Sequence, residues 1–360
     1  EKSGVAFGTS GARGLVSQLS DRTVFLYTTA FLRYLVSLGE FKEGDRVALG
    51  GDLRPSTPRI AASCAAAIRH CGGRVLNCGA ISSPAIALYA IREQIASVMV
   101  TGSHIPDDRN GIKFTRRSGE ITKRDEASIL QIELEEHGRL FNDDGSWVVV
   151  PEVHFSFEEM EAHALYRQRA IDFFGKGILQ GYRLGFYQHS GVARELIPDL
   201  LKELGAEVTL LGGSDEFIPV DTEAIREEDR QLAQKWAATK KFDAILSTDG
   251  DADRPLLADE KGEWWSGDQL GLLATRWLGI EAIALPVSSS TAAEKSGWVR
   301  TLRTKIGSPY VIEGMERLEE EGYRAVAGYE ANGGYLLQSE LLRNGKKLAP
   351  LPTRDVVLPL

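Results

Sequence analysis

The segment Phe242-Asp-Ala-Ile-Leu-Ser-Thr-Asp-Gly-Asp-Ala-Asp-Arg254 joins a short apolar run to a loop that carries three aspartates. The run Phe242–Ser247 is short and bounded by turn residues, which predicts a buried strand rather than a helix. The polar loop follows that strand directly. In open parallel sheets, ligands bind outside the carboxyl ends of the strands. The segment therefore predicts a polar site at the edge of a sheet.

The same arrangement occurs in two other parts of the chain. A predicted strand at Ala96–Thr101 leads into the loop Thr101–Pro106, and a predicted strand at Arg324–Gly328 leads into the loop Tyr329–Gly334. Strands and helices alternate in all three regions, which indicates parallel βα units. We therefore expect an α/β fold of three tandem βα modules, with mixed and largely parallel sheets around one cleft. The expected module borders are 1–150, 151–256 and 257–350.

The acidic loop carries the strongest chemical signal. Residues two apart in an extended loop face the same side, so Asp249, Asp251 and Asp253 should bring three carboxylates together. A hard divalent cation, Mg²⁺ or Ca²⁺, would neutralise them, and a solvated turn is the alternative. An EF-hand is excluded because its sixth position requires glycine, where this sequence has Arg254, and because a strand precedes the loop. We expect a Mg²⁺ site that also takes a phosphate oxygen, with Arg254 holding a second anion.

The loop after Ala96–Thr101 presents a hydroxyl group. Ser103 lies just beyond a buried strand, and a rigid loop of this kind is how a serine nucleophile is presented. The G-x-S-x-G elbow is absent, and in an extended backbone His104 should point away from Ser103. Lys113 follows a glycine turn shortly afterwards. It is either solvated or a partner of Ser103.

Two further loops are weak signals when taken alone. Phe7–Gly14 offers backbone N–H groups, the Ser10 hydroxyl and the Arg13 guanidinium to a phosphate, although a plain turn is an equal alternative. Glu330 and Asn332 offer a carboxylate and an amide, a pair that can take two sugar hydroxyls. A polar turn is again the alternative.

Composition narrows the class of protein. The 360 residues carry a net charge of −9, which argues against a broad nucleic-acid-binding face. No apolar run approaches the ~20 residues of a membrane span, and the first residues are not an apolar secretory segment. Three cysteines without a C-x-x-C pair favour a reducing compartment. We expect a cytoplasmic protein with small-molecule partners, without nucleic-acid or membrane partners, and either monomeric or weakly homodimeric.

Four loops, in this order, resemble those of the α-D-phosphohexomutase family. Phe7–Gly14 is similar to its F-G-T-S-G-x-R-G signature. Thr101–Pro106 and Asn110–Lys113 are similar to the T-A-S-H-N-P and N-G-I-K segments of its phosphoserine loop. Asp249–Arg254 resembles the D-G-D-A-D-R metal loop, and Glu330–Gly333 resembles the sugar-selecting G-E-x-S-G loop. The resemblance covers nearly the whole chain.

The resemblance implies a reaction and its participants. Ser103 would carry a phosphoryl group, and Mg²⁺ would be bound by that phosphoserine with Asp249, Asp251 and Asp253. The phosphoryl group would pass to a hexose phosphate, and the resulting hexose 1,6-bisphosphate would turn around and return its other phosphate. Arginine stays protonated in proteins, so Lys113 is a better proton carrier than Arg13. The implied catalytic residues are Ser103, Lys113, Arg13 and His104, and the implied substrate-binding residues are Ser10, Arg254, Gly307, Ser308, Glu330 and Asn332.

Departures from the family pattern bear on which sugar is bound, and they leave the reacting groups intact. Gly102 and Ile105 replace an alanine and an asparagine that do not react. Asn332 stands where many members have serine, and Ser308 where some have histidine. The family resemblance as a whole implies a mutase for mannose or glucose phosphates. A phosphoglucosamine or acetylglucosamine-phosphate mutase and a noncatalytic sugar-phosphate-binding homologue are the alternatives.

The last residues carry a separate expectation. The family has a fourth, phosphate-binding domain, and its R-x-S-G-T-E-P-type loop is not found in these 360 residues. Pro350 and Pro352 mark a break, after which Thr353–Val357 predicts the start of a helix. We therefore expect residues 351–360 to begin a linker to a fourth domain that this chain does not contain.

Overall fold

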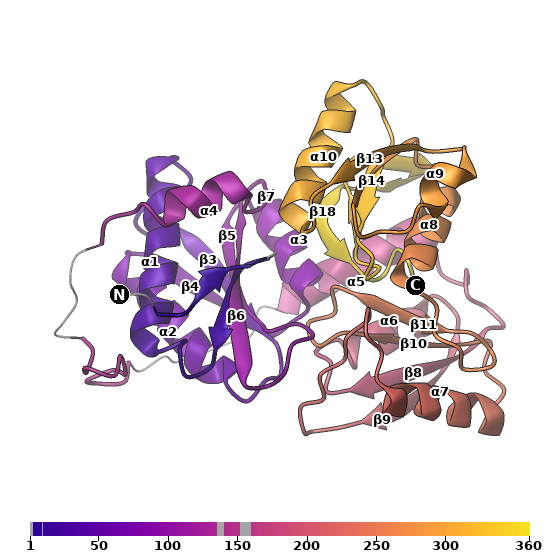
Figure 1. The fold of residues 1–360 in the computed structure, drawn as a ribbon, viewed down its shortest axis with the longest axis horizontal. Coiled ribbons are helices and arrows are strands. Elements are labelled where there is room, and N and C mark those ends of the chain that lie inside the picture. The colour runs from indigo at the N-terminus through magenta and orange to yellow at the C-terminus, as the bar shows by residue number, and fades with distance from the viewer. Residues whose placement is uncertain (1–2, 9, 135–139, 152–159) are drawn as a thin grey trace. The chain divides into compact units, whose positions relative to one another are not determined.

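The computed structural model describes residues 3–8, 10–134, 140–151 and 160–360 (Figure 1). Within these ranges the chain folds into two compact units, residues 1–163 and residues 164–360. None of the helices in the described ranges is both long and apolar enough to cross a membrane.

The first unit is a twisted sheet covered by helices. Its strands lie in the order β1-β2-β6-β5-β3-β4, and β7 pairs with β6. The strands β3, β4 and β5 are parallel, and the others are antiparallel to their neighbours. The elements are β1 (Ala6–Phe7), β2 (Ala12–Leu15), α1 (Asp21–Ser37), β3 (Arg46–Gly51), α2 (Thr57–His70), β4 (Arg74–Ala80), α3 (Ser83–Glu93), β5 (Ala96–Val100), β6 (Arg109–Arg116), β7 (Gly119–Glu120) and α4 (Lys123–Ile129).

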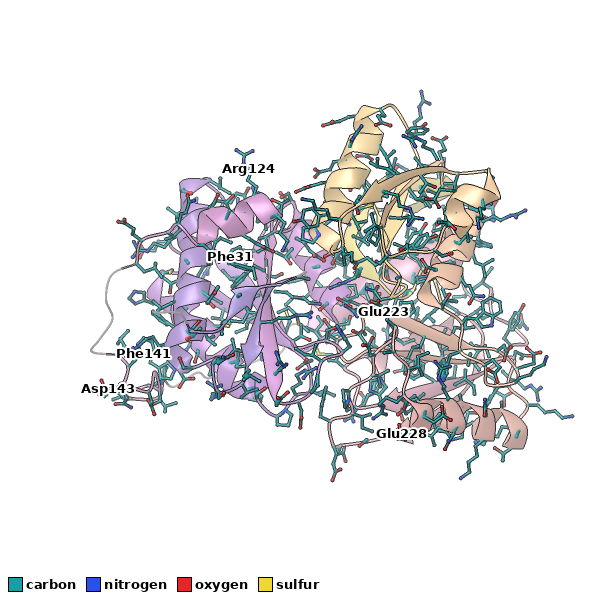
Figure 2. All side chains as sticks on the ribbon, viewed as in Figure 1. Phe31, Arg124, Phe141, Asp143, Glu223 and Glu228 are labelled. Atoms are coloured by element: carbon teal, nitrogen blue, oxygen red, sulfur yellow. The ribbon has the colours of Figure 1, made fainter. Side chains whose placement is uncertain are left out.

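The core of this unit forms where α1 and α2 pack on the sheet. Helix α1 begins at a cap in which the Ser20 hydroxyl accepts a hydrogen bond from the Thr23 N–H, and its apolar residues face inward. Phe31 is fully buried and stacks on Phe114 of β6 with ring centroids 4.5 Å apart. Figure 2 shows Phe31 inside the unit and Arg124 pointing outward. Burial of such aromatic pairs fixes the sheet beneath the helices.

The second unit contains two larger sheets and a separate two-stranded hairpin. The strand orders of the larger sheets are β11-β10-β8-β9 and β13-β12-β14-β15-β18. The elements of the first sheet are β8 (Arg183–His189), α6 (Leu196–Glu203), β9 (Glu207–Gly213), α7 (Glu227–Thr239), β10 (Ala244–Thr248) and β11 (Pro255–Ala258), and the helix before them, α5 (Met160–Phe174), contributes Phe173 to the core of the second sheet. Those around the second are α8 (Gly267–Leu278), β12 (Ala282–Pro286), α9 (Ala292–Ser296), β13 (Arg300–Thr304), α10 (Ser308–Glu320), β14 (Val326–Tyr329), β15 (Tyr335–Leu337), the hairpin β16 (Leu341–Arg343) and β17 (Lys346–Leu348), and β18 (Leu351–Asp355).

The three larger sheets repeat one topology. A central strand (β3, β8 or β12) pairs in parallel with the next strand in sequence on one side and with the third strand on the other. The chain then turns through a polar loop and returns as an antiparallel strand, which is β6, β11 or β15. The predicted α/β fold of tandem modules with mixed sheets is therefore confirmed. The return strands were not predicted, because they are short or begin with turn residues such as Asn110-Gly111 and Pro255.

The prediction for the end of the chain is wrong in one respect. Thr353 lies in strand β18, not at the start of a helix, and β18 pairs antiparallel with β15. Asp355 explains why this segment stays in the sheet, because its carboxylate accepts hydrogen bonds from Tyr166 and Arg169 of α5. The expected borders at 150/151, 256/257 and 350/351 remain predictions.

Candidate active site

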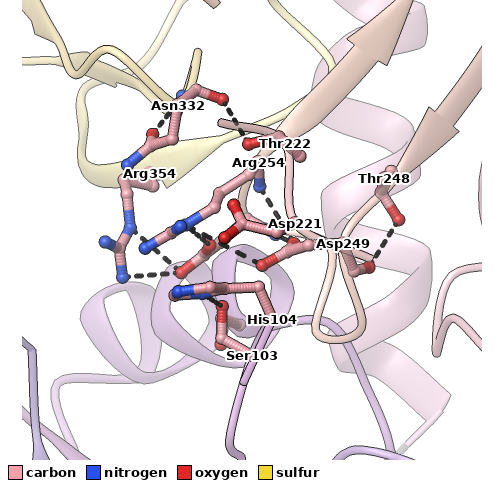
Figure 3. Close-up of polar contacts among 12 residues, drawn as sticks. Ser103, His104, Asp221, Thr222, Thr248, Asp249, Arg254, Asn332 and Arg354 are labelled. Carbon is pink, nitrogen blue, oxygen red and sulfur yellow. Dashed lines mark hydrogen bonds and ion pairs between the residues drawn. The ribbon is translucent and has the colours of Figure 1, made fainter. Parts of the chain in front are cut away.

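The loop between β5 and β6 holds Ser103 in an unusual backbone conformation. Ser103 has a φ of 56°, in the left-handed region that residues other than glycine seldom adopt. Its N–H donates to the Thr101 hydroxyl at 2.8 Å. As a result, the Ser103 Oγ lies 3.3 Å from His104 Nδ1 (Figure 3). The expectation that His104 points away from Ser103 is wrong, since it assumed an extended backbone.

Strand pairing places Lys113 and Arg13 on the two strands next to this loop. Lys113 lies opposite Met99 in the β5–β6 pair, and its Nζ contacts the Ser83 hydroxyl at 3.3 Å. Arg13 lies opposite Gly111 in the β2–β6 pair. A Cβ atom on Gly111 would come 2.8 Å from Arg13 Cγ and 3.1 Å from the Thr101 carbonyl oxygen. Glycine at 111 therefore lets the Arg13 side chain pass beside the start of the Ser103 loop.

The described residues of Phe7–Gly14 belong to two strands paired as in a β-hairpin rather than to a free loop, and Thr9 lies outside the described residues. Ala6 and Phe7 pair with Arg13 and Ala12, and the Gly8 N–H donates to the Gly11 carbonyl at 2.9 Å. Ser10 is buried in the turn of this hairpin. The Lys123 ammonium donates to the Gly8 carbonyl and so ties the turn to α4. The hairpin gives Arg13 a fixed position, which a plain turn would not.

Asp52 and Arg54 are functional candidates that sequence reasoning missed. They follow β3, and Asp52 Oδ2 accepts hydrogen bonds from the Thr101 hydroxyl at 2.8 Å and the Gly102 N–H at 3.2 Å. The Arg54 guanidinium donates to the Ser103 carbonyl at 2.9 Å. Both residues stand directly after the predicted strand Arg46–Gly50, and that position was the signal that could have revealed them.

In the second unit, the acidic loop forms a tight turn between β10 and β11. One carboxylate oxygen each from Asp249, Asp251 and Asp253 lies within 4.8 Å of the other two, and all three residues are buried. The predicted convergence is confirmed, but its cause is different. Ala252 has a φ of 53°, and Asp249 Oδ1 accepts from the backbone N–H groups of Asp253 at 3.1 Å and Arg254 at 3.2 Å. The turn, rather than an extended backbone, gathers the carboxylates.

This donor set fits a magnesium ion. Three carboxylate oxygens that close together are the hard ligands that Mg²⁺ prefers, and they leave coordination positions for phosphate oxygens and water. Arg254 lies 3.9 Å from Asp249 and 3.7 Å from Asp253 and offsets part of the negative charge. Behind the loop, the ring of His189 contacts the Thr248 carbonyl through Nε2 at 2.9 Å. Burial lowers the pKa of His189 from 6.5 to about 4, so its ring is neutral at pH 7.

The loop between β14 and β15 is a second turn in this unit. Glu330 and Gly334 close it, since the Glu330 N–H donates to the Gly334 carbonyl at 3.2 Å. Asn332 Oδ1 accepts from the Gly334 N–H at 2.9 Å, and its backbone carbonyl accepts from the Thr222 hydroxyl at 2.9 Å (Figure 3). Asn332 therefore uses its side-chain oxygen to shape the loop.

Arg354 joins the acidic loop to the Glu330 loop, and sequence reasoning did not single it out. Its Nε and Nη2 lie 3.0 and 2.8 Å from Asp253 Oδ2, and its Nη1 donates to Glu330 Oε2 at 3.1 Å. The arginine side chain is 1% exposed. It was missed because Thr353–Val357 was taken for a helix start, whereas strand β18 brings residue 354 back to both loops.

Gly307 and Ser308 lie at a third strand end in this unit. They connect β13 to α10, with Gly307 at a φ of 124° and Ser308 as the first residue of the helix. A helix N-terminus offers backbone N–H groups to an anion. The structure thus places both predicted substrate-binding residues at the carboxyl end of a parallel strand, as Glu330 and Asn332 are.

Comparisons with known proteins agree with these observations. Residues 4–138 match the family model of the phosphoglucomutase/phosphomannomutase α/β/α domain I, and residues 171–262 match that of domain II. The chain is 44% identical to a phosphomannomutase of Salmonella muenchen, over 99% of this chain and 72% of the relative. It is 43% identical to a phosphomannomutase of Sinorhizobium fredii, over 99% of this chain and 74% of the relative.

A solved structure shares the fold. A phosphoglucomutase/phosphomannomutase family protein from Burkholderia thailandensis aligns with a TM-score of 0.73 at 20% identity, covering 98% of this chain and 74% of that one. The matches to both domain models and to relatives above 40% identity establish the class. The chain belongs to the phosphoglucomutase/phosphomannomutase family of α-D-phosphohexomutases.

Proposed function

We propose that the protein is a phosphomutase that interconverts hexose 1-phosphates and hexose 6-phosphates, with mannose phosphates as its principal substrates. The observation that carries this proposal is the convergence of three carboxylates on one hairpin loop in a chain of this family. The relatives named above support mannose as the sugar, since both are phosphomannomutases. Mg²⁺ and a hexose 1,6-bisphosphate are the cofactors that this reaction uses.

The transferred phosphoryl group is assigned to Ser103. In the first transfer the P–O bond to Ser103 Oγ breaks, and a new P–O bond forms to the free C1 or C6 hydroxyl of the hexose phosphate. Lys113 is assigned to carry the proton of that hydroxyl to the departing Ser103 Oγ, and in the second transfer the proton of the Ser103 hydroxyl returns to the sugar oxygen that the other phosphate leaves. Such transfers depend on positioning and charge stabilisation more than on covalent chemistry.

The remaining residues are assigned to bind Mg²⁺ and the substrate and to neutralise the charge of the phosphate groups. Asp249, Asp251 and Asp253 are assigned as ligands of Mg²⁺, which when bound withdraws charge from the phosphoserine oxygens. Arg13 and His104 are assigned to the transferring group, because Arg13 lies beside the start of the loop and His104 contacts the Ser103 hydroxyl. The assigned substrate-binding residues are Ser10, Arg254, Gly307, Ser308, Glu330 and Asn332.

The test is turnover on a panel of sugar phosphates. The 1-phosphates of mannose, glucose, glucosamine and N-acetylglucosamine are each supplied with Mg²⁺ and a trace of the matching 1,6-bisphosphate, and products are followed by ³¹P NMR. The highest kcat/KM for mannose 1-phosphate is expected. A preference for either aminosugar would identify the alternative mutase, and binding without turnover would identify a noncatalytic homologue.

Intact mass and peptide mapping test the nucleophile. Wild-type protein treated with the bisphosphate should gain one phosphate at Ser103, and Ser103→Ala should gain none and lose turnover. Ser128→Ala, in helix α4, is the matched control. Phosphate at another residue would refute the assignment. We also propose that the protein is a cytoplasmic monomer or weak homodimer and that it has no nucleic-acid or membrane partners.

A further inference from the structure

The guanidinium group of Arg54 lies at the centre of the loop that carries Ser103. Its side chain is fully buried beside Asp52. Nη2 donates to the carbonyls of Ser103 at 2.9 Å and Ile105 at 2.5 Å. Nη1 donates to the carbonyls of Pro106 at 2.7 Å and Arg109 at 3.1 Å. Four backbone carbonyls of one loop thus converge on a single side chain.

These contacts use the full donor capacity of the residue. An arginine has five N–H donors. Four point at the loop carbonyls, and the fifth, on Nε, donates to Asp52 Oδ2 at 3.2 Å. Lysine has three donors on one nitrogen and cannot reproduce this planar set. The site therefore requires arginine, and not merely a positive charge.

Arg54 and Asp52 together hold Ser103 from both sides. Asp52 Oδ2 accepts from the Thr101 hydroxyl, and the Thr101 oxygen in turn accepts from the Ser103 N–H. Arg54 holds the Ser103 carbonyl. The peptide groups on either side of the Ser103 Cα are thereby fixed, and these contacts maintain its left-handed φ of 56°. Residues in such conformations persist only where their surroundings over-determine them.

Gly102 leaves the space that the guanidinium occupies. A Cβ atom at this position would lie 2.4 Å from Arg54 Cζ and 2.6 Å from its Nε, closer than real contacts allow. Gly102 is not among the residues with a left-handed φ, so alanine would meet no backbone penalty there. The family resemblance leads one to expect alanine at 102. In this chain alanine would displace a side chain that five hydrogen bonds hold in place.

We propose that Arg54 is a positioning residue that fixes the backbone of the phosphoserine loop, and that Gly102 is its packing partner. Arg54 acts through Ser103, because it sets the direction in which the Ser103 hydroxyl points. The proposal rests on the proposed function, in which Ser103 carries the phosphoryl group. A displacement of about 1 Å in a reacting group can cost roughly 10²-fold in rate.

The experiment compares Arg54→Lys and Gly102→Ala with Arg59→Lys in the full chain. Arg59 is a suitable control because it also bonds one aspartate, Asp21, and the carbonyls of Leu19 and Val16, away from the Ser103 loop. We expect Arg54→Lys to lower kcat by about 10²-fold, with little change in the KM for hexose phosphate. Gly102→Ala should lower kcat less, and Arg59→Lys should leave it unchanged.

Hydrogen exchange of the peptide covering residues 101–109 provides a readout that needs no activity. Both loop variants should exchange faster there than wild type and Arg59→Lys. The double variant should be no worse than Arg54→Lys alone, because both changes break the same contacts. Failure of the proposed function would appear as wild-type protein without turnover or phosphoserine, with the exchange comparison still readable. Unchanged exchange and kcat in Arg54→Lys, or independent losses in the double variant, would overturn the proposal.

Discussion

Replacing Arg354 by glutamine tests whether the acidic loop and the Glu330 loop depend on a shared buried cation. The guanidinium is 1% exposed and contacts Asp253 at 2.8 Å and Glu330 at 3.1 Å. Removing one partner of a buried ion pair leaves uncompensated charge and costs about 3–5 kcal/mol. Arg354→Gln removes the nearest cation from two such carboxylates at once, while Arg254 stays 3.7 Å from Asp253. The loss should therefore lie at the upper part of this range.

The assay is calorimetric unfolding without added metal. For a unit of this size, 1 kcal/mol shifts Tm by roughly 2–4 °C, so a loss of about 4–5 kcal/mol should lower Tm by roughly 8–20 °C. Arg317→Gln is the control, because Arg317 forms an exposed i,i+4 pair with Glu321 and such pairs contribute about 0.3–0.5 kcal/mol.

A double variant tests whether Arg354 and Glu330 stabilise the protein through the same contact. Arg354→Gln combined with Glu330→Gln removes one of the two stranded charges, and its loss of stability should be smaller than the sum of the single losses. If Arg354→Gln shifts Tm no more than Arg317→Gln does, or if the two changes are additive, then Arg354 does not hold these carboxylates together.

Three further outcomes are expected. Asp251→Asn should weaken Mg²⁺ binding at least about tenfold by titration calorimetry, since it removes one of three carboxylate ligands, whereas Asp259→Asn in the turn after β11 should not. Glu330→Gln should lower kcat/KM for hexose phosphates by about 10–150-fold, the equivalent of a lost charged hydrogen bond of about 1.5–3 kcal/mol, and exposed Glu340→Gln should have no effect. Stability should fall as pH drops from 6.5 toward 4, because burial lowers the pKa of folded His189 to about 4 while the unfolded chain binds that proton near 6.5. His189→Asn should reduce this slope, of about 1.4 kcal/mol per pH unit, in urea titrations, and an unchanged slope would rule His189 out as its source.

Local patterns were sufficient for the general architecture. The apolar runs before Thr101, Thr248 and Tyr329 predicted strands, and the structure ends β5, β10 and β14 within a residue of those positions. The polar loops could be located because turn residues and carboxylates follow these runs directly. Such signals lie within a few residues of sequence, so no long-range contact is needed to recognise them.

The return strands and the side-chain partners could not be predicted from local sequence patterns. The segment Thr353–Val357 resembled a helix start because it follows the break at Pro350 and Pro352, yet pairing with β15 and the bonds from Tyr166 and Arg169 to Asp355 keep β18 in the sheet. His104 was placed on the wrong side because the sequence does not reveal that Ser103 adopts a positive φ. Each error concerns a contact between residues distant in sequence, or a backbone angle that such contacts impose.

The sequence by itself determined the order of the modules and the chemical groups of each loop, since a run of apolar residues and three aspartates within five positions are local facts. Only the tertiary structure decided which groups act together. Arg54 reaches a loop about fifty residues later, and Arg354 reaches Asp253 about a hundred residues earlier. Buried charges must find partners wherever the fold places them, and that choice is made by the packing of strands rather than by their sequence.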